Sequence, residues 1–160
     1  MIQCFGPSVS IIVRYPGGIS GGSWPTVRLH TEHGIPAERV VAIPRGVDLT
    51  RFEPGLVSAE RVKALREAWG VSPEDRRLKV LLAGRLTRWK GQALVIEAMA
   101  RLKAISDTRI LLLLVGDDQG RKAYRAELEH MIAQAGLQDS VRLVGHCDDM
   151  PAAYLMADLA

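Results

Sequence analysis

The 160 residues suit one domain with a hydrophobic core, because apolar residues make up 48% of the chain and charged residues 24%. Aromatic residues contribute only 5%, so aliphatic side chains must fill that core. The formal net charge is +3 with both signs interspersed. That charge disfavours nucleic acid as a partner, but it is compatible with a small anionic ligand bound at a local positive spot.

The sequence shows neither a membrane span nor a signal peptide. No apolar run approaches the roughly 18 residues of a spanning helix, and no basic flank precedes an apolar stretch at the N-terminus. We therefore predict a cytoplasmic location, and peripheral membrane association stays open. Cys4 and Cys147 lie far apart and fit no metal-ligand spacing, which predicts two free thiols and no metal site.

The first 30 residues differ from the rest of the chain. Val9–Val13 can form one short strand. The stretch Tyr15–Pro25 contains four glycines and two prolines. Because these residues interrupt both helices and strands, we predict a loop or disorder there.

Predicted strands and helices alternate from Val40 onward. Apolar runs predict strands at Val40–Ile43, Lys79–Ala83, Ile110–Val115 and Val141–Val144. Apolar residues at helical spacing predict helices at 58–69, 92–104 and 121–135, the first capped by Ser58 and ended by Gly70, the third ended by Gly136. Asp149 and Pro151 begin a further short helix. This alternation is typical of the α/β class, with a Rossmann-like parallel sheet and flanking helices.

Three loops leave the carboxyl ends of the predicted strands, where such sheets bind ligands. The first begins at Gly84 and places Arg85, Arg88 and Lys90 near a helix N-terminus, which favours an anion such as a diphosphate. The alternative is that these cations are simply solvated and the glycines only shape a turn. The segment is not a P-loop, because Lys90 is followed by Gly91.

The second and third loops also carry candidate site residues. Gly116 and Asp117 suit a turn close to a ligand; the alternative is an ordinary loop in which Asp118 caps the next helix. In the third loop, Gly145 and Asp148 flank His146 and Cys147, and free backbone groups there could contact the edge of a nucleotide base. His146 could be a general acid or base, but a lone loop histidine usually is not. Cys147 reads as a small buried side chain rather than a reactive thiol.

Four motifs in register resemble the retaining glycosyltransferases with the two-domain GT-B architecture, in the branch called group 1 or family 4-like. They are Ile43–Asp48 with Arg51–Pro54, Gly84–Leu86 with Lys90–Gly91, Leu114–Asp117, and Val141–Gly145. The resemblance covers residues 31–160 and departs from the family's usual asparagine at Arg45. It implies an incomplete GT-B C-terminal domain, with 31–56 as the interdomain crossover and 57–160 as a partial nucleotide-sugar-binding domain. Residues 1–30 do not resemble the family, and we interpret them as unrelated sequence or as the product of a misread gene.

The resemblance also implies roles for individual residues. Arg85 and Lys90 would bind the diphosphate of a nucleotide-sugar donor and stabilise charge on the leaving group, so they are the predicted catalytic residues. The predicted donor-binding residues are Gly84, Gly116, Asp117, Gly145, His146, Cys147 and Asp148, with the loop His146–Asp148 at the base. No metal or other cofactor is expected.

The predicted reaction is sugar transfer to a glycan or lipid acceptor, which a domain outside this chain would bind. In the family, two glutamates that hold the donor's sugar and ribose follow the position of Ala160. We therefore expect this chain to be inactive alone. The alternative is a non-catalytic nucleotide-binding module. An unrelated α/β domain such as a response regulator is disfavoured, because no acidic cluster follows the first strand.

Overall fold

The computed structural model describes residues 9–13, 19–20, 40–44 and 48–160, with side chains for 48–160. The chain forms two compact units, Met1–Leu49 and Thr50–Ala160. Each unit is described by itself. Cys4, predicted to be a free thiol, and Arg45 and Gly46, in the predicted crossover, lie outside the described residues.

The first unit contains a small antiparallel sheet. Strand β1 (Val9–Val13) lies between β2 (Ile19–Ser20) and β3 (Val40–Pro44). The strand predicted at Val9–Val13 is confirmed. The loop predicted across Tyr15–Pro25 is wrong at Ile19 and Ser20, because these residues pair with the end of β1.

Strand β3 also differs from its prediction in its partner. It pairs antiparallel with β1 along its whole length, from Pro44 opposite Val9 to Val40 opposite Val13, and does not enter the parallel sheet. A short apolar run predicts a strand but does not identify the strand beside it, and that choice depends on contacts distant in sequence.

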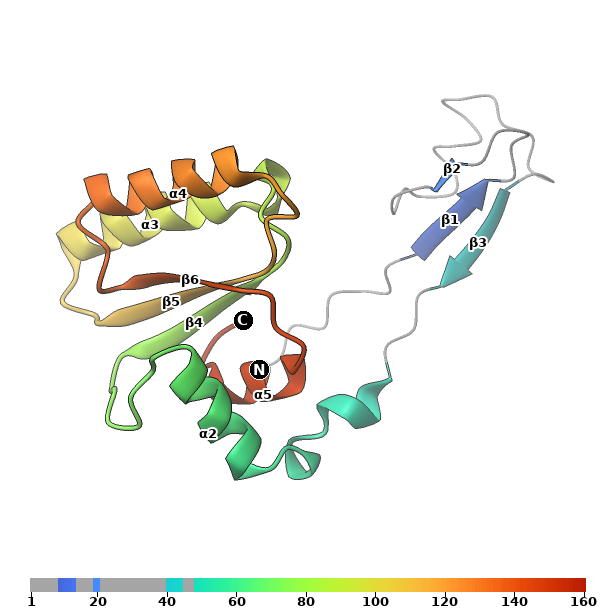
Figure 1. The fold of residues 1–160 in the computed structure, drawn as a ribbon, viewed down its shortest axis with the longest axis horizontal. Coiled ribbons are helices and arrows are strands. Elements are labelled where there is room, and N and C mark those ends of the chain that lie inside the picture. The colour runs from blue at the N-terminus through green and yellow to red at the C-terminus, as the bar shows by residue number, and fades with distance from the viewer. Residues whose placement is uncertain (1–8, 14–18, 21–39, 45–47) are drawn as a thin grey trace. The chain divides into compact units, whose positions relative to one another are not determined.

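The second unit is built on a parallel sheet in the order β4-β5-β6 (Figure 1). The strands are β4 (Leu78–Ala83), β5 (Ile110–Val115) and β6 (Val141–Gly145). The central strand reads ILLLLV, and the four leucines from Leu111 to Leu114 have 0% exposure. A parallel strand that is covered on both faces is apolar throughout, so the predicted α/β fold is confirmed here.

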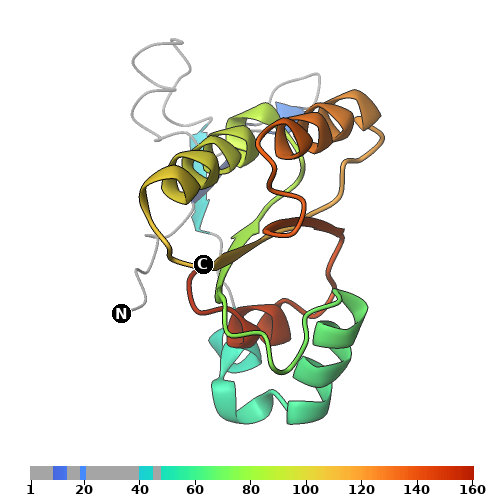
Figure 2. The same cartoon turned by 90° about the vertical axis from the view of Figure 1, so that its left-hand side faces the viewer.

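Helices cover both faces of this sheet and give three layers (Figures 1 and 2). Helices α3 (Gln92–Ile105) and α4 (Lys122–Gln134) lie on one face, and α2 (Ala59–Ala68) and α5 (Met150–Met156) on the other. The side chain of Ser58 caps α2, as predicted. The four predicted helices are thus present, with ends that differ by one or two residues.

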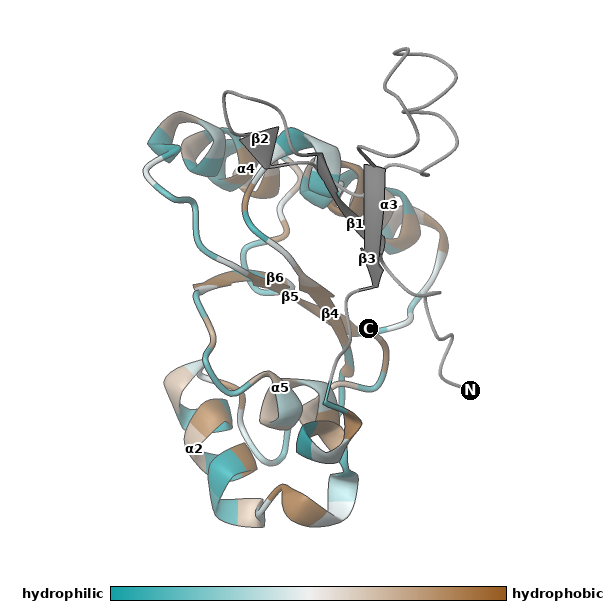
Figure 3. Ribbon diagram, turned by 90° about the vertical axis from the view of Figure 1, so that its right-hand side faces the viewer, coloured by the Kyte–Doolittle hydropathy of each residue, from teal (hydrophilic) through white to brown (hydrophobic). Residues whose placement is uncertain are grey.

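The hydrophobic core has two parts, one on each side of the sheet. Leu112 and Leu114 point into the cluster under α3 and α4, whereas Leu111 and Leu113 point into the cluster under α2 and α5. Side chains alternate between the faces of a strand, so one strand supplies both clusters. Figure 3 shows the hydrophobic strands between the two amphipathic helix layers.

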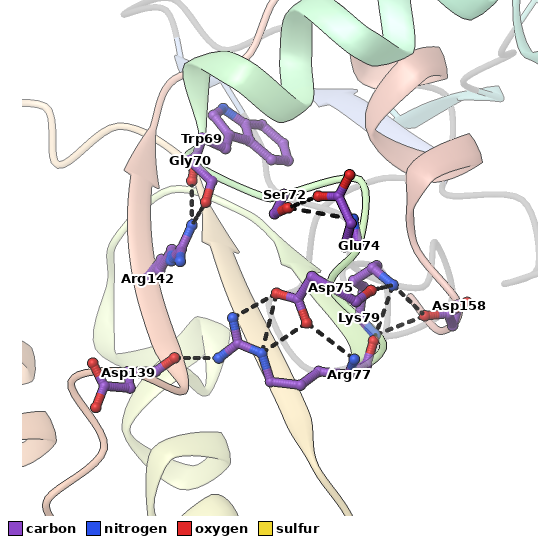
Figure 4. A network of polar contacts seen from close by, with 10 residues as sticks. All are labelled: Trp69, Gly70, Ser72, Glu74, Asp75, Arg77, Lys79, Asp139, Arg142 and Asp158. Atoms are coloured by element: carbon purple, nitrogen blue, oxygen red, sulfur yellow. Dashed lines mark hydrogen bonds and ion pairs between the residues drawn. The ribbon is translucent and has the colours of Figure 1, made fainter.

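A polar network holds the amino end of β4 (Figure 4). Arg77 binds both carboxylate oxygens of Asp75, and its Nη2 lies 2.6 Å from Oδ2. Lys79 is only 8% exposed; its Nζ donates to the carbonyls of Asp75 and Arg77 and lies 3.8 Å from the carboxylate of Asp158. The backbone N–H groups of Asp158 and Leu159 donate to the carbonyl of Lys79. The network therefore ties the last residues of the chain to β4 and explains the buried lysine.

Arg142 makes a second polar link in the same region (Figure 4). This β6 side chain donates to the carbonyl oxygens of Trp69, at 2.6 Å, and Gly70. Those carbonyls lie at the C-terminal end of α2, where they lack intrahelical donors, so the guanidinium satisfies them and complements the helix dipole.

Candidate functional site

The three predicted loops meet at the carboxyl edge of the parallel sheet. The first two follow β4 and β5 at Gly84 and Gly116, and the third begins at Gly145, the last residue of β6. Main-chain hydrogen bonds connect them: Gly84 N–H donates to the carbonyl of Val115 at 2.8 Å, and Gly116 N–H donates to the carbonyl of Gly145 at 2.7 Å. The ladder of the sheet thus extends past the strand ends into the loops.

Glycine is required where the first two loops touch. A Cβ on Gly116 would lie 2.0 Å from the carbonyl oxygen of Gly84 and 3.1 Å from the backbone nitrogen of Arg85. Any side chain at Gly116 would therefore separate the loops. The third glycine, Gly145, adopts a φ of 79°, which side chains disfavour.

Lys90 packs between Gly84 and Trp89. The Lys90 Cδ would lie 3.3 Å from a Cβ on Gly84, so the aliphatic part of the lysine fills the space that the glycine leaves. The ammonium lies 4.2 Å from the centre of the Trp89 ring, a cation–π contact. Trp89 is 71% exposed, and no carboxylate within the described residues pairs with Lys90. Its charge therefore stays unneutralised within the described part of the chain.

Arg85 is exposed, and among the described residues it contacts only neutral groups. Its Nη1 donates to Oε1 of Gln119 at 3.2 Å. Its carbonyl accepts a 2.9 Å hydrogen bond from Nε2 of Gln92, whose side chain is 1% exposed. No acidic partner of Arg85 occurs in residues 48–160, so its positive charge is available to a ligand.

Arg88, the third cation of the loop, is paired differently. Its guanidinium binds both carboxylate oxygens of Glu127 on α4, at 2.7 and 2.5 Å, and lies 5.2 Å from the centre of the Tyr124 ring. The hydrogen bonds to Glu127 raise the pKa of Arg88. The charge of Arg88 is therefore balanced within the protein, unlike those of Arg85 and Lys90.

The second loop is a pair of side-chain-supported turns. The carboxylate of Asp117 accepts from Gln119 N–H at 2.9 Å, and that of Asp118 accepts from Gly120 N–H at 2.8 Å. Gln119 has a φ of 50°, in the left-handed region. The alternative in which Asp118 caps the next helix is wrong, because α4 begins at Lys122, beyond the reach of that turn.

The third loop exposes its imidazole and partly buries its thiol. His146 Nε2 lies 2.9 Å from a carboxylate oxygen of Asp148, and both side chains point into solvent, 68% and 96% exposed. Cys147 is half-buried against the core under α2 and α5, and burial raises the pKa of its thiol. The thiol therefore lacks the lowered pKa of a nucleophile, in line with a packing role.

A cavity of about 420 Å³ lies beside the third loop. Its wall includes the ion pair between Arg61 of α2 and Asp149, with nitrogen–oxygen distances of 2.8 and 2.6 Å. Arg61 lowers the pKa of Asp149, which also caps α5 through Ala152 N–H. The lining residues are Thr50, Arg51, Leu56, Arg61, Asp148, Asp149 and Pro151.

Sequence reasoning missed Gln92 and Gln119. Both are uncharged residues in positions where glutamine has no special propensity, and only the folded geometry shows that their amides hold Arg85. The described part of the chain contains no cluster of three histidine, cysteine or acidic side chains suited to a metal ion. Among its helices, none combines the length and apolarity needed to cross a membrane.

The chain resembles known glycosyltransferases in sequence and structure. A D-inositol 3-phosphate glycosyltransferase of Jonesia denitrificans is 33% identical over 130 residues, 80% of this chain and 30% of that protein. A glycosyltransferase from Rickettsia africae superposes with a TM-score of 0.72 at 26% identity, covering 82% of this chain and 34% of that one. HepE of Anabaena, solved in complex with UDP and glucose, gives 0.64 at 29% identity over 79% and 32% of the chains.

This chain thus spans about a third of the length of these relatives. The family described as Glycosyl transferases group 1 matches residues 66–160, which include all three loops. The resemblance to GT-B glycosyltransferases inferred from the four motifs is therefore confirmed, and the chain belongs to the glycosyl transferases group 1 family.

Proposed function

We propose that the carboxyl edge of the β4-β5-β6 sheet binds the diphosphate of a nucleotide-sugar donor through Arg85 and Lys90. One observation carries the proposal: these two cations lie on one loop, held by neutral contacts, with no acidic partner among the described residues. An arginine can bind phosphate oxygens with two hydrogen bonds, and a lysine adds a point charge. Relatives with this fold support the choice of ligand, since HepE was solved with UDP.

The same two side chains would assist sugar transfer. When the bond between the anomeric carbon and the diphosphate breaks, the electron pair stays on the phosphate oxygen, and Arg85 and Lys90 stabilise that developing charge. The acceptor's hydroxyl oxygen forms the new bond to the anomeric carbon, and its proton passes to the departing phosphate oxygen. The family resemblance predicts retention of the anomeric configuration.

The other predicted site residues complete the donor site in this proposal. Gly145, where no atom lies within 4 Å of an added Cβ, lets the donor approach the main chain closely. Gly84 and Gly116 hold their two loops in contact at the donor site, beside the turn formed by Asp117. The exposed backbone of the His146–Asp148 loop contacts the nucleotide base, with Cys147 as packing beneath it. His146 has no role as a proton-transfer group in this proposal, because its imidazole and the carboxylate of Asp148, its partner within the described residues, both point into solvent.

The acceptor, a glycan or lipid, is assigned to a part of the enzyme outside residues 1–160, with 31–56 as the crossover towards it. We expect the 160-residue chain to bind the donor nucleotide without transferring its sugar, in the cytoplasm. The second candidate, a nucleotide-binding module without catalysis, is favoured by the absence of a general base within contact of Arg85 or Lys90 in the described residues.

Binding of UDP and GDP to the purified chain tests the site. We expect Arg85→Ala and Lys90→Ala each to weaken binding about tenfold or more, the typical effect of losing a charge-assisted hydrogen bond. Arg88→Ala is the matched control, because it removes a cation of the same loop whose charge Glu127 already balances. Equal losses in all three variants, or no binding by the unaltered chain, would contradict the site.

Incubation with radiolabelled UDP- and GDP-sugars tests the rest. Release or transfer of sugar at enzyme-like rates, sensitive to Arg85→Ala, would overturn the expectation that this chain is inactive alone. Binding without turnover agrees both with an inactive part of a glycosyltransferase and with a non-catalytic nucleotide-binding module. Turnover that appears when the remaining parts of a related glycosyltransferase are added would support the first of these.

A further inference from the structure

Gln119 joins two arginines from different parts of the second unit. Its Oε1 accepts a hydrogen bond from Nη1 of Arg85 at 3.2 Å and another from Nη1 of Arg121 at 3.1 Å. The two guanidinium nitrogens therefore lie within about twice a hydrogen-bond length of each other. Two like charges so close repel each other unless an anion lies between or beside them.

No carboxylate within the described residues pairs with Arg121. Its Nη1 and its backbone N–H also donate to the carbonyl of Asp118, at 3.3 and 2.9 Å. The carboxylates of Asp117 and Asp118 lie in the same loop, but each accepts a backbone N–H within its own turn. Arg125, one turn further along α4, is by contrast paired with Glu129 at 2.9 Å.

Gln119 is placed to position the two arginines without neutralising their charge. A neutral amide oxygen orients two guanidinium groups without cancelling their charge, whereas a glutamate there would form two ion pairs. Gln119 keeps this position at a φ of 50°, a conformation that side chains rarely adopt. Backbone strain of this kind is maintained only when the surroundings require it.

We propose that Arg121 is a further binding residue for the donor's diphosphate and that Gln119 is the positioning residue for the pair Arg85 and Arg121. The proposal rests on the proposed function of the Gly84–Gly91 loop and extends its cation set to the loop after β5. Arg121 is the N-cap residue of α4, whose first turn has no side-chain cap hydrogen bond, so the positive end of the helix dipole favours the same anion.

The test measures the affinities of the whole 160-residue chain for UDP, inorganic pyrophosphate and uridine by NMR titration of backbone amides. We expect Arg121→Ala to weaken UDP and pyrophosphate about tenfold while leaving uridine unchanged, since uridine carries no phosphate. Arg125→Ala is the matched control on the same helix and should change none of the three affinities.

Variants of Gln119 test its positioning role. Gln119→Glu should weaken UDP binding more than Gln119→Ala does, because the carboxylate competes with the diphosphate for both arginines. A role limited to the fold would give the opposite order, since the glutamate retains the contacts that stabilise the loop. Asparagine also tolerates the left-handed backbone, but its side chain is shorter. Gln119→Asn should therefore weaken UDP binding if the amide position matters, and leave UDP binding unchanged if only the φ of 50° matters.

The outcomes separate this inference from the proposed function. If Arg85→Ala abolishes UDP binding but Arg121→Ala leaves it intact, Arg121 is excluded and the proposed site stands. If Arg125→Ala weakens binding as much as Arg121→Ala, the effect is general attraction, and the inference is overturned. If the unaltered chain binds neither UDP nor pyrophosphate, both the site and its extension fail.

Discussion

Replacing Gly116 with alanine tests the idea that backbone contact between loops holds the site together. The new Cβ would lie 2.0 Å from the carbonyl oxygen of Gly84 and 2.6 Å from its carbonyl carbon, so main chain must move. Overpacking costs about 1–3 kcal/mol. Displacing the loops also weakens the bonds from Gly84 to Val115 and from Gly116 to Gly145, at about 1 kcal/mol each.

We therefore expect Gly116→Ala to lower the free energy of unfolding of the second unit by about 3–5 kcal/mol. Gly120→Ala is the matched control in the same loop. Gly120 has a φ of 80° but no atom within 4 Å of a Cβ, so only backbone strain of about 1 kcal/mol applies.

Urea denaturation followed by tryptophan fluorescence measures both variants, because Trp69 is buried in the core of this unit. Far-UV circular dichroism provides the second probe. Similar losses of stability in Gly116→Ala and Gly120→Ala would refute the reasoning, since the close approach at Gly84 would then have no energetic consequence. Nucleotide affinity should fall in the first variant and persist in the second.

Two further predictions concern titratable groups, Asp75 at the amino end of β4 and Cys147 in the third loop. Arg77 holds the pKa of Asp75 well below its usual value, so this carboxylate stabilises the fold above about pH 4 and loses that contribution as the pH falls. Asp75→Asn should therefore lower the free energy of unfolding by about 1–3 kcal/mol at pH 7 and progressively less below pH 4. Urea denaturation measures this loss, with the exposed Asp107→Asn as the control, and a loss independent of pH would contradict the prediction. Burial raises the pKa of Cys147, so in a Cys4→Ser background its alkylation by iodoacetamide at pH 7.5 should be slower than that of a free thiol, and an equal rate would argue against burial.

The sequence predicted those parts of the fold that depend on local pattern. The length and continuous apolarity of Ile110–Val115 predicted a covered central strand, and Ser58 with Gly70 predicted the ends of a helix by their capping chemistry. It did not predict that Val40–Pro44 pairs with β1, because strand partners are chosen through contacts distant in sequence. The buried Lys79 was also unforeseeable, since its partner Asp158 lies 79 residues further on.

The candidate site divides in the same way. Loop position follows from strand order, so the meeting of Gly84, Gly116 and Gly145 could be predicted. The sequence did not predict which cation remains unpaired, because Arg88 contacts Glu127 only after α4 packs beside its loop. The amide of Gln119 likewise gains a purpose only when two arginines reach it.

The hydrogen-bond ladder that runs from β4 through Gly84 and Gly116 to Gly145 has a thermodynamic consequence for ligand binding. Loops held by main-chain bonds continuous with a sheet lose their conformational freedom when the chain folds, not when the ligand arrives. A nucleotide that meets such a surface orders itself and a few long side chains, while the backbone beneath stays as it was. At the proposed donor site, we therefore expect the affinity for a nucleotide to depend mainly on the charges that project from the loops.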